Sequence, residues 1–583
     1  MAGQRGHEHW SGDYPEGVPR HVDIPDEDLL VGFSRAVTSH PNRVATWFQG
    51  RSTTYAELAD AISRAASALR GLGVTKGDRV ALALPNCPAH VVAFLAVLRL
   101  GAVVVEHNPL YTADELERQL TDSGATVAIC WQPTAVRVAE VQERTSVTTL
   151  VAVDVSKDLP AAKRLALRLP VARAREARAR LTAHPPAGAL DWHALVRDAE
   201  HLDHDHPRPA PSDLAVLQYT GGTTGNPKGA MLTHRNLVAN PVMGEAWTGL
   251  SAEDPEGAVV YATLPLFHAY GLTLCLSFGL RIAATIVLFP RFDAEEVIDV
   301  QRTVPATFMP VVPPMLDRIV TAARDATEPV DFSSLRFVMS GAMPLPAATA
   351  SAWEDLTGAL VIEGYGLTEC SPIALGNPFS ELRRPGWLGV PFPSTDIRIT
   401  DQDDPVRDVG PGERGELLVA GPQVFAGYWG RAAEDEGVLW TDDDGTTWLR
   451  TGDVVVQDEV GFVRLVDRIK EMIISGGFKI FPSQVEQVLR AMPGVADAAV
   501  VGLPAGGDGA GADLGEQVVA AIVPDDAARA HEVPVDVDAV RAWCVERLAR
   551  YAIPRQVVVV DELPRSMIGK VLRREVRDHL LGR

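Results

Sequence analysis

Hydrophobic and polar positions along the first quarter of the chain switch repeatedly between helical and strand spacing. Apolar side chains share one helical face over residues 54–70. Further along, Thr112 and Glu115 form a capping box that opens another helix. The expected helices are 54–70, 88–100 and the one after Thr112, and the expected strands are 79–84, 102–106 and 125–130. This alternation predicts a largely parallel sheet covered by helices on both faces.

The pattern changes near residue 467. Ser483 and Glu486 are expected to form a capping box on a helix over 482–492, followed by strands 496–502 and 517–523, helix 537–548 and strand 556–560. These elements predict a small α+β unit of roughly 115 residues. The fold class is therefore α/β, with a large N-terminal domain of layered sheets and helices. The expected divisions are a loose head at 1–25, the large domain at 26–466 and the small domain at 467–583.

Two polar segments leave alternatives open. Residues 162–181 carry seven basic residues and one acid, and Leu165, Leu169 and Ala172 form a candidate apolar stripe. Such a helix suits a membrane surface or an anionic ligand, but we favour a solvated helix that forms salt bridges to an acidic body. The histidine-rich run 201–206 resembles a metal cluster, yet the prolines around it favour a flexible linker.

Composition narrows the class of protein. The net charge of -22 argues against nucleic acid as a partner, because such a surface repels phosphates. The five cysteines are scattered, without zinc spacing, and indicate a reducing, cytoplasmic location. The N-terminus has no apolar core of signal-peptide type. The most apolar stretch, 271–290, is broken by polar residues, and we interpret it as a buried helix followed by a strand.

The most informative segment for chemistry is 219–230, Tyr-Thr-Gly-Gly-Thr-Thr-Gly-Asn-Pro-Lys-Gly-Ala, which follows an apolar strand. Its glycines let backbone N–H groups converge on an anion, while threonine hydroxyls and Lys228 add donors and a charge. These features predict a phosphate-binding loop. It is not a Walker A loop, because Pro227 rather than glycine precedes the lysine.

Further motifs occur in a fixed order along the chain. They are Leu-Pro-Leu-Phe-His-Ala-Tyr-Gly at 264–271, Ser-Gly-Ala at 340–342, Glu-Gly-Tyr-Gly-Leu-Thr-Glu at 363–369, Thr-Gly-Asp at 451–453, the 467–480 segment, and Pro-Arg-Ser-Met-Ile-Gly-Lys at 564–570. Together with the 219–230 segment they resemble the adenylate-forming superfamily, and most closely its long-chain fatty acid–CoA ligases. The resemblance extends from about residue 30 to 575.

The resemblance implies roles for individual residues. Catalytic roles fall to Lys570, Thr368 and Glu369, and the metal site, for Mg²⁺, to Glu369 and Thr220. The implied ATP and AMP contacts are Thr220, Gly221, Gly222, Thr223, Thr224, Gly225, Lys228, Gly341, Ala342, Glu363, Gly364, Tyr365, Gly366, Thr368, Asp453, Arg468 and Lys570.

The same resemblance assigns the acyl substrate to a second group of residues and coenzyme A to a third. The acyl group is His268, Ala269, Tyr270, Gly271, Val312, Pro313 and Ser340, although His268 is equally well explained as a core histidine. Lys470 occupies the position of a hinge, about which a mobile small domain rotates to bring Ser475, Gly476 and Gly477 to the thiol.

The implied reaction joins a carboxylic acid, expected to be a medium- to long-chain fatty acid, to coenzyme A through an acyl-adenylate. ATP and Mg²⁺ are required, and AMP and pyrophosphate are released. No fused carrier domain is expected after Lys570, which favours coenzyme A over a carrier protein as acceptor. The alternatives are an enzyme that loads an acyl-carrier protein, a luciferase-like oxygenase and a non-catalytic nucleotide-binding module. The sequence leaves open whether 162–181 contacts a membrane. It also leaves open whether the glycine-rich 505–512 loop alters the surface that meets the thiol of coenzyme A.

Overall fold

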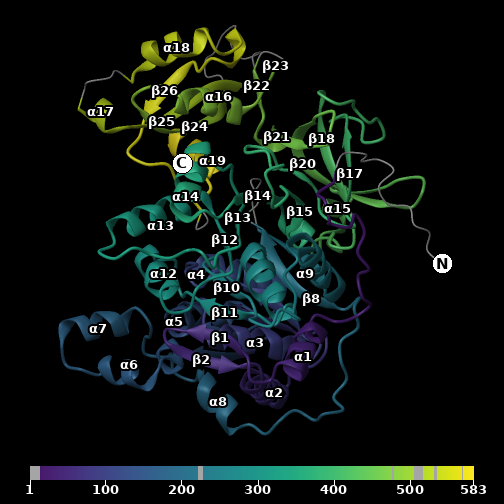
Figure 1. Ribbon diagram of the computed structural model, residues 1–583, viewed down its shortest axis with the longest axis vertical. Helices are drawn as coiled ribbons and strands as arrows, with labels where there is room; N and C mark the ends of the chain where they lie inside the picture. Colours follow the sequence, from purple (N-terminus) through teal and green to yellow (C-terminus); the bar gives the residue numbers. More distant parts are fainter. Residues whose placement is uncertain are drawn as a thin grey trace.

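The computed structural model describes residues 14–220, 227–475, 478–504, 516–530, 535–566 and 569–582. Within these ranges, two large sheets form the base of the molecule (Figure 1). The first has the strand order β16 (Val390–Pro391), β15 (Ile373–Gly376), β14 (Val361–Gly366), β13 (Phe337–Ser340), β12 (Phe308–Val311), β10 (Val259–Ala262), β11 (Thr285–Leu288), β1 (Val44–Phe48) and β2 (Arg51–Thr54).

The second large sheet contains the strands expected from the first quarter of the chain. Its order is β7 (Leu190–Asp191), β6 (Thr149–Val153), β5 (Val127–Trp131), β3 (Arg79–Ala83), β4 (Val103–Glu106), β8 (Leu214–Thr220) and β9 (Lys228–Thr233). The pairs β3–β4, β3–β5, β5–β6 and β4–β8 are all parallel, which confirms the prediction of a largely parallel sheet. Glu106 and Gln218 are register partners at the ends of β4 and β8.

Helices cover both large sheets. The bounds are α1 (Leu30–Ser39), α2 (Tyr55–Gly71), α3 (Pro88–Arg99), α4 (Ala113–Ser123), α5 (Gln132–Val141), α6 (Ala161–Ala166), α7 (Ala172–Ala179), α8 (Trp192–Asp198), α9 (His234–Thr248), α10 (Ala269–Gly271), α11 (Phe278–Arg281), α12 (Ala294–Gln301), α13 (Pro313–Asp325), α14 (Ala347–Thr357) and α15 (Ala432–Asp435). The expected capping box at Thr112 and Glu115 is confirmed at the start of α4. The apolar stretch after residue 271 is a buried helical segment followed by strand β11, as expected.

A third sheet joins the large domain near the right side of Figure 1. It contains β17 (Asp396–Thr400), β18 (Arg414–Ala420), β20 (Thr447–Gln457), β19 (Leu439–Thr441) and β21 (Val463–Arg468). Its buried side chains, such as Leu417, Leu449 and Val455, belong to the same hydrophobic core as the large sheets.

The C-terminal elements form a separate small domain at the top of Figure 1. Its strands are β22 (Ile473–Ser475), β23 (Phe478–Ile480), β24 (Val495–Pro504), β25 (Glu516–Pro524) and β26 (Gln556–Val559), and its helices are α16 (Pro482–Arg490), α17 (Asp526–Arg529), α18 (Val537–Val545) and α19 (Arg573–Leu580). Its buried residues form cores of their own on the two faces of β24 and β25. The predicted fold class, a large layered domain with a small α+β domain, is confirmed.

The expected capping box on α16 is wrong. Ser483 donates from its Oγ to Asp467 (3.1 Å), and the backbone N–H of Ser483 donates to the same carboxylate (2.7 Å). Glu486 is buried, where it accepts the N–H of Val500 (2.9 Å) and pairs with Arg573 (2.7 Å). Both side chains that a local capping box would need are therefore bonded to residues elsewhere in the structure.

The basic segment 162–181 also differs from the interpretation we favoured. Pro170 lies between two short helices, α6 and α7, because proline cannot continue a helix. Leu165 is 67% exposed and Leu169 54% exposed, and no arginine of the segment forms a salt bridge to a described residue. The segment is a solvated hairpin of helices, but not one held by ion pairs to an acidic body.

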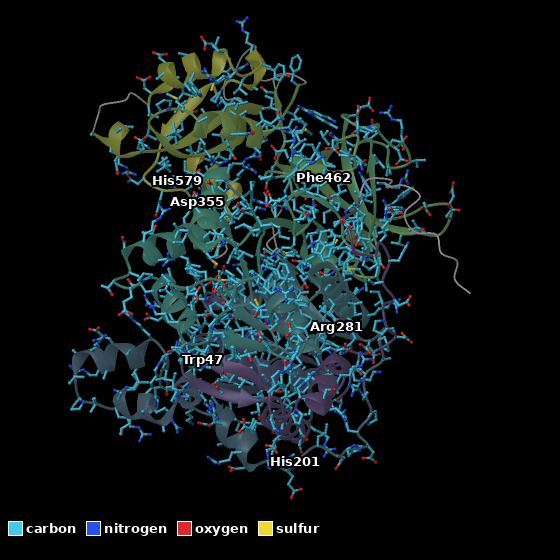
Figure 2. The ribbon with its side chains drawn as sticks, viewed as in Figure 1. Trp47, His201, Arg281, Asp355, Phe462 and His579 are labelled. Atoms are coloured by element: carbon cyan, nitrogen blue, oxygen red, sulfur yellow. The ribbon has the colours of Figure 1, made fainter. Side chains whose placement is uncertain are left out.

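The histidine run is a surface connection. Nε2 of His201 pairs with Oδ1 of Asp60 (2.6 Å), and Figure 2 shows His201 at the opposite end of the molecule from His579. Among the described residues, no group of three or more metal-ligating side chains is close enough to hold an ion. Within the same residues, no helix has both the length and the apolar character needed to cross a bilayer.

Candidate active site

Three motif residues from different strands meet near the junction of the two domains. The hydroxyl of Tyr365, on β14, donates to Oδ2 of Asp453 (2.6 Å), on β20. Nε of Arg468, at the end of β21, lies 2.9 Å from Oδ1 of the same carboxylate. Asp453 and Arg468 are direct cross-strand partners of the β20–β21 ladder, so the sheet itself sets this pairing. Tyr365 and Asp453 are both buried.

Lys570 reaches this group from the small domain. Its loop is closed by hydrogen bonds between Ser566 and Lys570, and Gly569 has a φ of +80°, which favours glycine. A side chain at Gly569 would approach Pro314 and Met343, so the loop lies against the large domain. Burial, and then the charge of the Arg468 guanidinium, lower the pKa of Lys570 to about 8, while the Asp453 carboxylate partly opposes this fall. The charges of Arg468 and Asp453 therefore both act on the Lys570 ammonium.

A second polar group surrounds Glu369. Oε1 of Glu369 accepts a hydrogen bond from the hydroxyl of Tyr428 (2.6 Å). The ammonium of Lys228 lies 5.0 Å from the centre of the Tyr428 ring and forms an ion pair with Glu434. Tyr428 thus contacts both the implied metal ligand and the lysine of the phosphate loop.

The ends of the phosphate loop are held by strand pairing. Thr220 and Lys228 are antiparallel partners at the ends of β8 and β9. Residues 221–226, which include Gly221, Gly222, Thr223, Thr224 and Gly225, lie outside the described residues. The pKa of Lys228 is lowered by burial first, and then by the charges of Lys470 and Arg431. This cluster of cations suits a polyanionic ligand such as a triphosphate.

The donor set around Glu369 fits Mg²⁺. This ion binds proteins through one or two carboxylates together with the phosphate oxygens of a substrate and retained water. Glu369 supplies one such carboxylate next to the cationic end of the phosphate loop. A richer cluster of protein ligands would suit other metals better, and none is present among the described residues.

The Glu363–Gly366 segment is the end of β14 and carries Tyr365. Glu363 accepts backbone N–H groups from Leu345 (3.2 Å) and Gly386 (2.6 Å), while burial raises the pKa of its carboxyl. Gly364 and Gly366 lie on the same strand, and Thr368 begins the short helix η4 (Thr368–Cys370) that carries Glu369. Ala342 has a φ of +66°, an unusual backbone conformation for a residue with a side chain.

The acyl-side motif packs against the ends of β12 and β13. Tyr270 is buried, and its hydroxyl donates to the carbonyl of Met339 (2.9 Å). A Cβ added at Gly341 would lie 3.0 Å from the Tyr270 ring, so that glycine makes room for the aromatic side chain. Nδ1 of His268 accepts the N–H of Tyr270 (3.2 Å), and burial lowers the pKa of His268 to about 4. His268 therefore caps helix α10 as a neutral imidazole.

The remaining acyl-side residues line the same region. Ala269 and Gly271 are buried in α10, while Val312 and Pro313 are buried at the start of α13. Ser340 ends β13, and its buried Oγ has no partner among the described residues. An unpaired buried hydroxyl beside the adenine-side motif suits a polar group of a bound substrate.

The implied thiol-side residues are divided. Lys470 lies in the short helix η5 (Ile469–Glu471) between β21 and β22, and its charge acts on Lys228 of the phosphate loop. Ser475 ends β22, and the β22–β23 hairpin lies at the top of Figure 1, with Phe478 stacked on Tyr551 of the small domain (ring centroids 4.4 Å apart). Gly476 and Gly477 lie outside the described residues.

Tyr428 and Glu434 are site residues that the sequence patterns did not identify. Tyr428 lies between two glycines with positive φ, Gly427 and Gly430, in the segment that follows Phe425. The signal that was available is an aromatic pair enclosed by glycines, which indicates a tight loop presenting a ring.

The comparisons with known proteins agree with this geometry. The model of the AMP-binding enzyme family matches residues 33–429, and that of the AMP-binding enzyme C-terminal domain matches 484–570. A long-chain-fatty-acid–CoA ligase of Salmonella typhimurium is 37% identical over 98% of both chains. A feruloyl-CoA synthase of Amycolatopsis is 37% identical over 93% of this chain and 97% of its own. The chain belongs to the family of AMP-binding enzymes, and it is an AMP-forming acid–thiol ligase that uses ATP, Mg²⁺ and coenzyme A.

Two solved structures of one enzyme are similar to this chain over nearly its whole length. ATP-bound MatB from Rhodopseudomonas palustris, 28% identical, superposes with a TM-score of 0.78 over 95% of this chain and 99% of its own. The same enzyme without a ligand gives 0.69 at the same coverage. As a whole, the present structure is thus more similar to the ATP-bound form than to the ligand-free form.

Proposed function

We propose that the acid is a medium- to long-chain fatty acid, which the enzyme converts to its acyl-CoA. The observation that carries the activity is the approach of Lys570 to the Asp453–Arg468 pair. The choice of acid is supported by the long-chain ligase relative and by the resemblance of the ordered motifs to long-chain fatty acid–CoA ligases. The feruloyl-CoA synthase relative makes an aromatic acid the second candidate.

In the first half-reaction, an oxygen of the substrate carboxylate attacks the α-phosphorus of ATP, and pyrophosphate leaves. We assign Asp453 and Arg468 to the ribose, Tyr365 to the face of adenine, and the 220–228 loop to the β- and γ-phosphates. Glu369 would hold Mg²⁺, which neutralises charge on the phosphates, with Thr220 as the second candidate ligand. Lys570 and Thr368 donate to the α-phosphate as charge develops there.

In the second half-reaction, the thiolate of coenzyme A attacks the acyl carbonyl, and AMP leaves. We propose that the chain divides at η5, that Lys470 is the hinge, and that rotation there exchanges Lys570 for the Ser475 loop. The supporting observation is that β21 completes a sheet of the large domain, whereas Ile473 and Ile480 belong to the core of the small domain. A short connection between separate cores is the usual form of a hinge.

The two half-reactions are separated by one substitution. Lys570→Ala should slow formation of acyl-adenylate by about 100- to 1,000-fold, since a donor of this kind contributes about 3–4 kcal/mol to the transition state. Thioester formation from supplied acyl-adenylate and coenzyme A should continue. Pyrophosphate exchange measures the first step and a thiol-consumption assay the second. Equal loss of both steps would contradict the assigned role.

The acid and the acceptor are identified by a competition experiment. The enzyme receives Mg²⁺-ATP, coenzyme A and an equimolar set of acids, from acetate to long-chain fatty acids together with ferulate, and mass spectrometry identifies the products. We expect a fatty acyl-CoA and AMP to dominate. A dominant feruloyl-CoA would overturn the fatty acid assignment, and acyl-adenylate without thioester would favour the rival function, loading of an acyl-carrier protein. We place the reaction in the cytoplasm because ATP and coenzyme A are supplied there.

A further inference from the structure

Helices α6 and α7 form a hairpin that projects from the lower left of the molecule in Figure 1, away from the small domain. We call residues 161–181 the basic hairpin. Leu167 and Leu181 point inward and pack on the main core, and Ala174 is buried. The indole N–H of Trp131 donates to the carbonyl of Leu181 (2.7 Å). The hairpin is therefore fastened to the body at defined points.

The outer surface of the basic hairpin carries unpaired positive charge. Seven lysine and arginine residues accompany a single acid, Glu176, in a protein with a net charge of -22. Lys163 donates to Gln49 (3.1 Å), and the six arginines are exposed without a salt bridge to any described residue. Many arginines elsewhere in this acidic protein have a carboxylate partner, such as Arg208 with Asp28. Free cations concentrated on one projection indicate an anionic partner.

Large apolar side chains are exposed among these cations. Leu165, Leu169 and Val171 are 67%, 54% and 52% exposed and lie around the turn between α6 and α7. Because Leu167 and Leu181 of the same hairpin do pack inward, the outward leucines are not explained by a hairpin that fails to pack. Exposed apolar side chains interleaved with cations are characteristic of segments that bind a membrane surface.

We propose that the basic hairpin docks this enzyme on the surface of an anionic lipid bilayer. The arginines would contact lipid phosphates, while Leu165, Leu169 and Val171 enter the boundary between headgroups and acyl chains. A nucleic acid would use the cations but give the leucines no apolar medium. The acidic body does not cancel the attraction, because charges farther than about 8 Å from the surface are screened at physiological salt.

Docking on a bilayer would bring the enzyme close to its substrate. This advantage rests on the proposed function, in which the substrate is a fatty acid. Long-chain fatty acids partition into bilayers, so an enzyme held at the surface meets them at high local concentration. The hairpin projects at the end of the molecule away from the small domain, so a docked enzyme leaves that domain free to rotate (Figure 1).

The test measures binding of the full-length enzyme to vesicles without substrate. Vesicles of mixed phosphatidylcholine and phosphatidylglycerol are compared with pure phosphatidylcholine in a sedimentation assay. We expect binding to the anionic vesicles alone. The charge variant Arg164→Gln, Arg168→Gln, Arg175→Gln should weaken it by about 100-fold, at roughly fivefold for each cation near the surface. The apolar variant Leu165→Asn, Leu169→Asn, Val171→Asn should also weaken it, and more strongly at high salt.

A matched control removes three exposed arginines elsewhere, Arg118→Gln, Arg324→Gln and Arg555→Gln, and should bind as the parent does. Turnover of octanoate, a soluble acid, should be the same in all variants, which shows that they are folded. The proposal would be overturned if the control variant lost vesicle binding as strongly as the charge variant, or if the parent enzyme did not bind the vesicles. It would also be overturned if the apolar variant bound the vesicles as the parent does. That result, together with tight binding of the parent to RNA, would indicate a nucleic acid partner. Because no substrate is present, vesicle binding stands even if the acid proves to be aromatic.

Discussion

The charge of Lys570 is set by its surroundings and should govern the pH dependence of the first step. Its pKa is lowered to about 8, so the free enzyme loses this proton as the pH rises through 8. We expect kcat/KM for ATP in pyrophosphate exchange to fall above about pH 8, because this parameter reports ionisations of the free enzyme. Bound triphosphate should raise the pKa, which moves the corresponding fall in kcat to higher pH.

Two controls separate this effect from general alkaline inactivation. Lys570→Arg should be slower but lose the alkaline fall, because a guanidinium stays protonated. In the parent enzyme, the rate of thioester formation from supplied acyl-adenylate should not fall near pH 8. An identical alkaline limb in the parent and in Lys570→Arg would show that another group titrates.

The hydroxyl of Tyr428 should act on Mg²⁺ through Glu369. Tyr428→Phe removes the hydrogen bond to the carboxylate but keeps the ring under the Lys228 ammonium. Loss of an outer partner of a metal ligand weakens metal binding by roughly 10- to 100-fold, so the Mg²⁺ concentration at half-maximal rate should rise by at least about tenfold. Tyr428→Ala should in addition raise KM for ATP. A Tyr428→Phe enzyme with unchanged Mg²⁺ dependence would rule out this role.

At the residue scale, the family resemblance implied that Asp453 and Arg468 both contact the nucleotide, but it did not predict their pairing. The register of β20 and β21 brings them together. Tyr428 and Glu434 were missed because their contacts depend on how a loop of the third sheet folds over β9. The capping box at Ser483 failed because Asp467 and Arg573, far along the chain, compete for its two side chains.

At the scale of elements, the acyl-side loop is held by one buried amide. Nδ2 of Asn86, just after β3, donates to the carbonyls of Ala262 (2.9 Å) and Leu264 (2.8 Å), and its Oδ1 accepts the N–H of Leu266 (2.8 Å). These backbone groups lead directly into the segment that carries His268 and Tyr270. Asn86 therefore ties the seven-stranded sheet to the loop expected to contact the acid.

Asn86→Ala should leave these groups without partners in a buried site. We expect a loss of at least about 3 kcal/mol in the free energy of unfolding, since three groups lose their partner and each buried group left unpaired costs about 1–3 kcal/mol. KM for the acid should rise while KM for ATP changes little, because the loop faces the acyl side. Chemical denaturation and steady-state kinetics measure the two effects. Asn86→Asp, which sets a buried carboxylate against the two carbonyl oxygens, should destabilise the protein at least as much as Asn86→Ala.

Element prediction succeeded where spacing alone decides the structure. The alternating segments up to residue 131 fold within one or two residues of their expected bounds. Helices α2 and α4 each bury one apolar face, whereas β3, β4, β5 and α3 are continuous apolar runs that are almost fully buried. The prediction of a single helix over 162–181 was wrong. Leu165 and Leu169 have helical spacing, but Pro170 ends the first helix and a second one begins after it. The sequence showed that cations gather there; only the packing of Leu167 and Leu181 shows which side faces outward.

At the scale of the whole molecule, the change of pattern near residue 467 predicted two domains but not their relative position. That position depends on a few contacts across a short connection, including the approach of the Gly569 loop to Pro314 and Met343. Such contacts have no sequence period. In the arrangement described here the charges of Asp453 and Arg468 act on Lys570, and we propose that the small domain moves before the second half-reaction.

Lys470→Pro tests whether that movement occurs at η5. Proline fixes φ near −65°, so a hinge that changes this angle can no longer rotate freely. The short helix already present is compatible with such a φ, and adenylate formation should therefore persist. Thioester formation should fall by at least about tenfold, and acyl-adenylate should accumulate when both co-substrates are supplied. Lys470→Ala, which leaves the backbone free, should retain both steps. If Lys470→Pro completes the full reaction at the rate of Lys470→Ala, the rotation takes place elsewhere, and the domain division we propose at η5 is wrong.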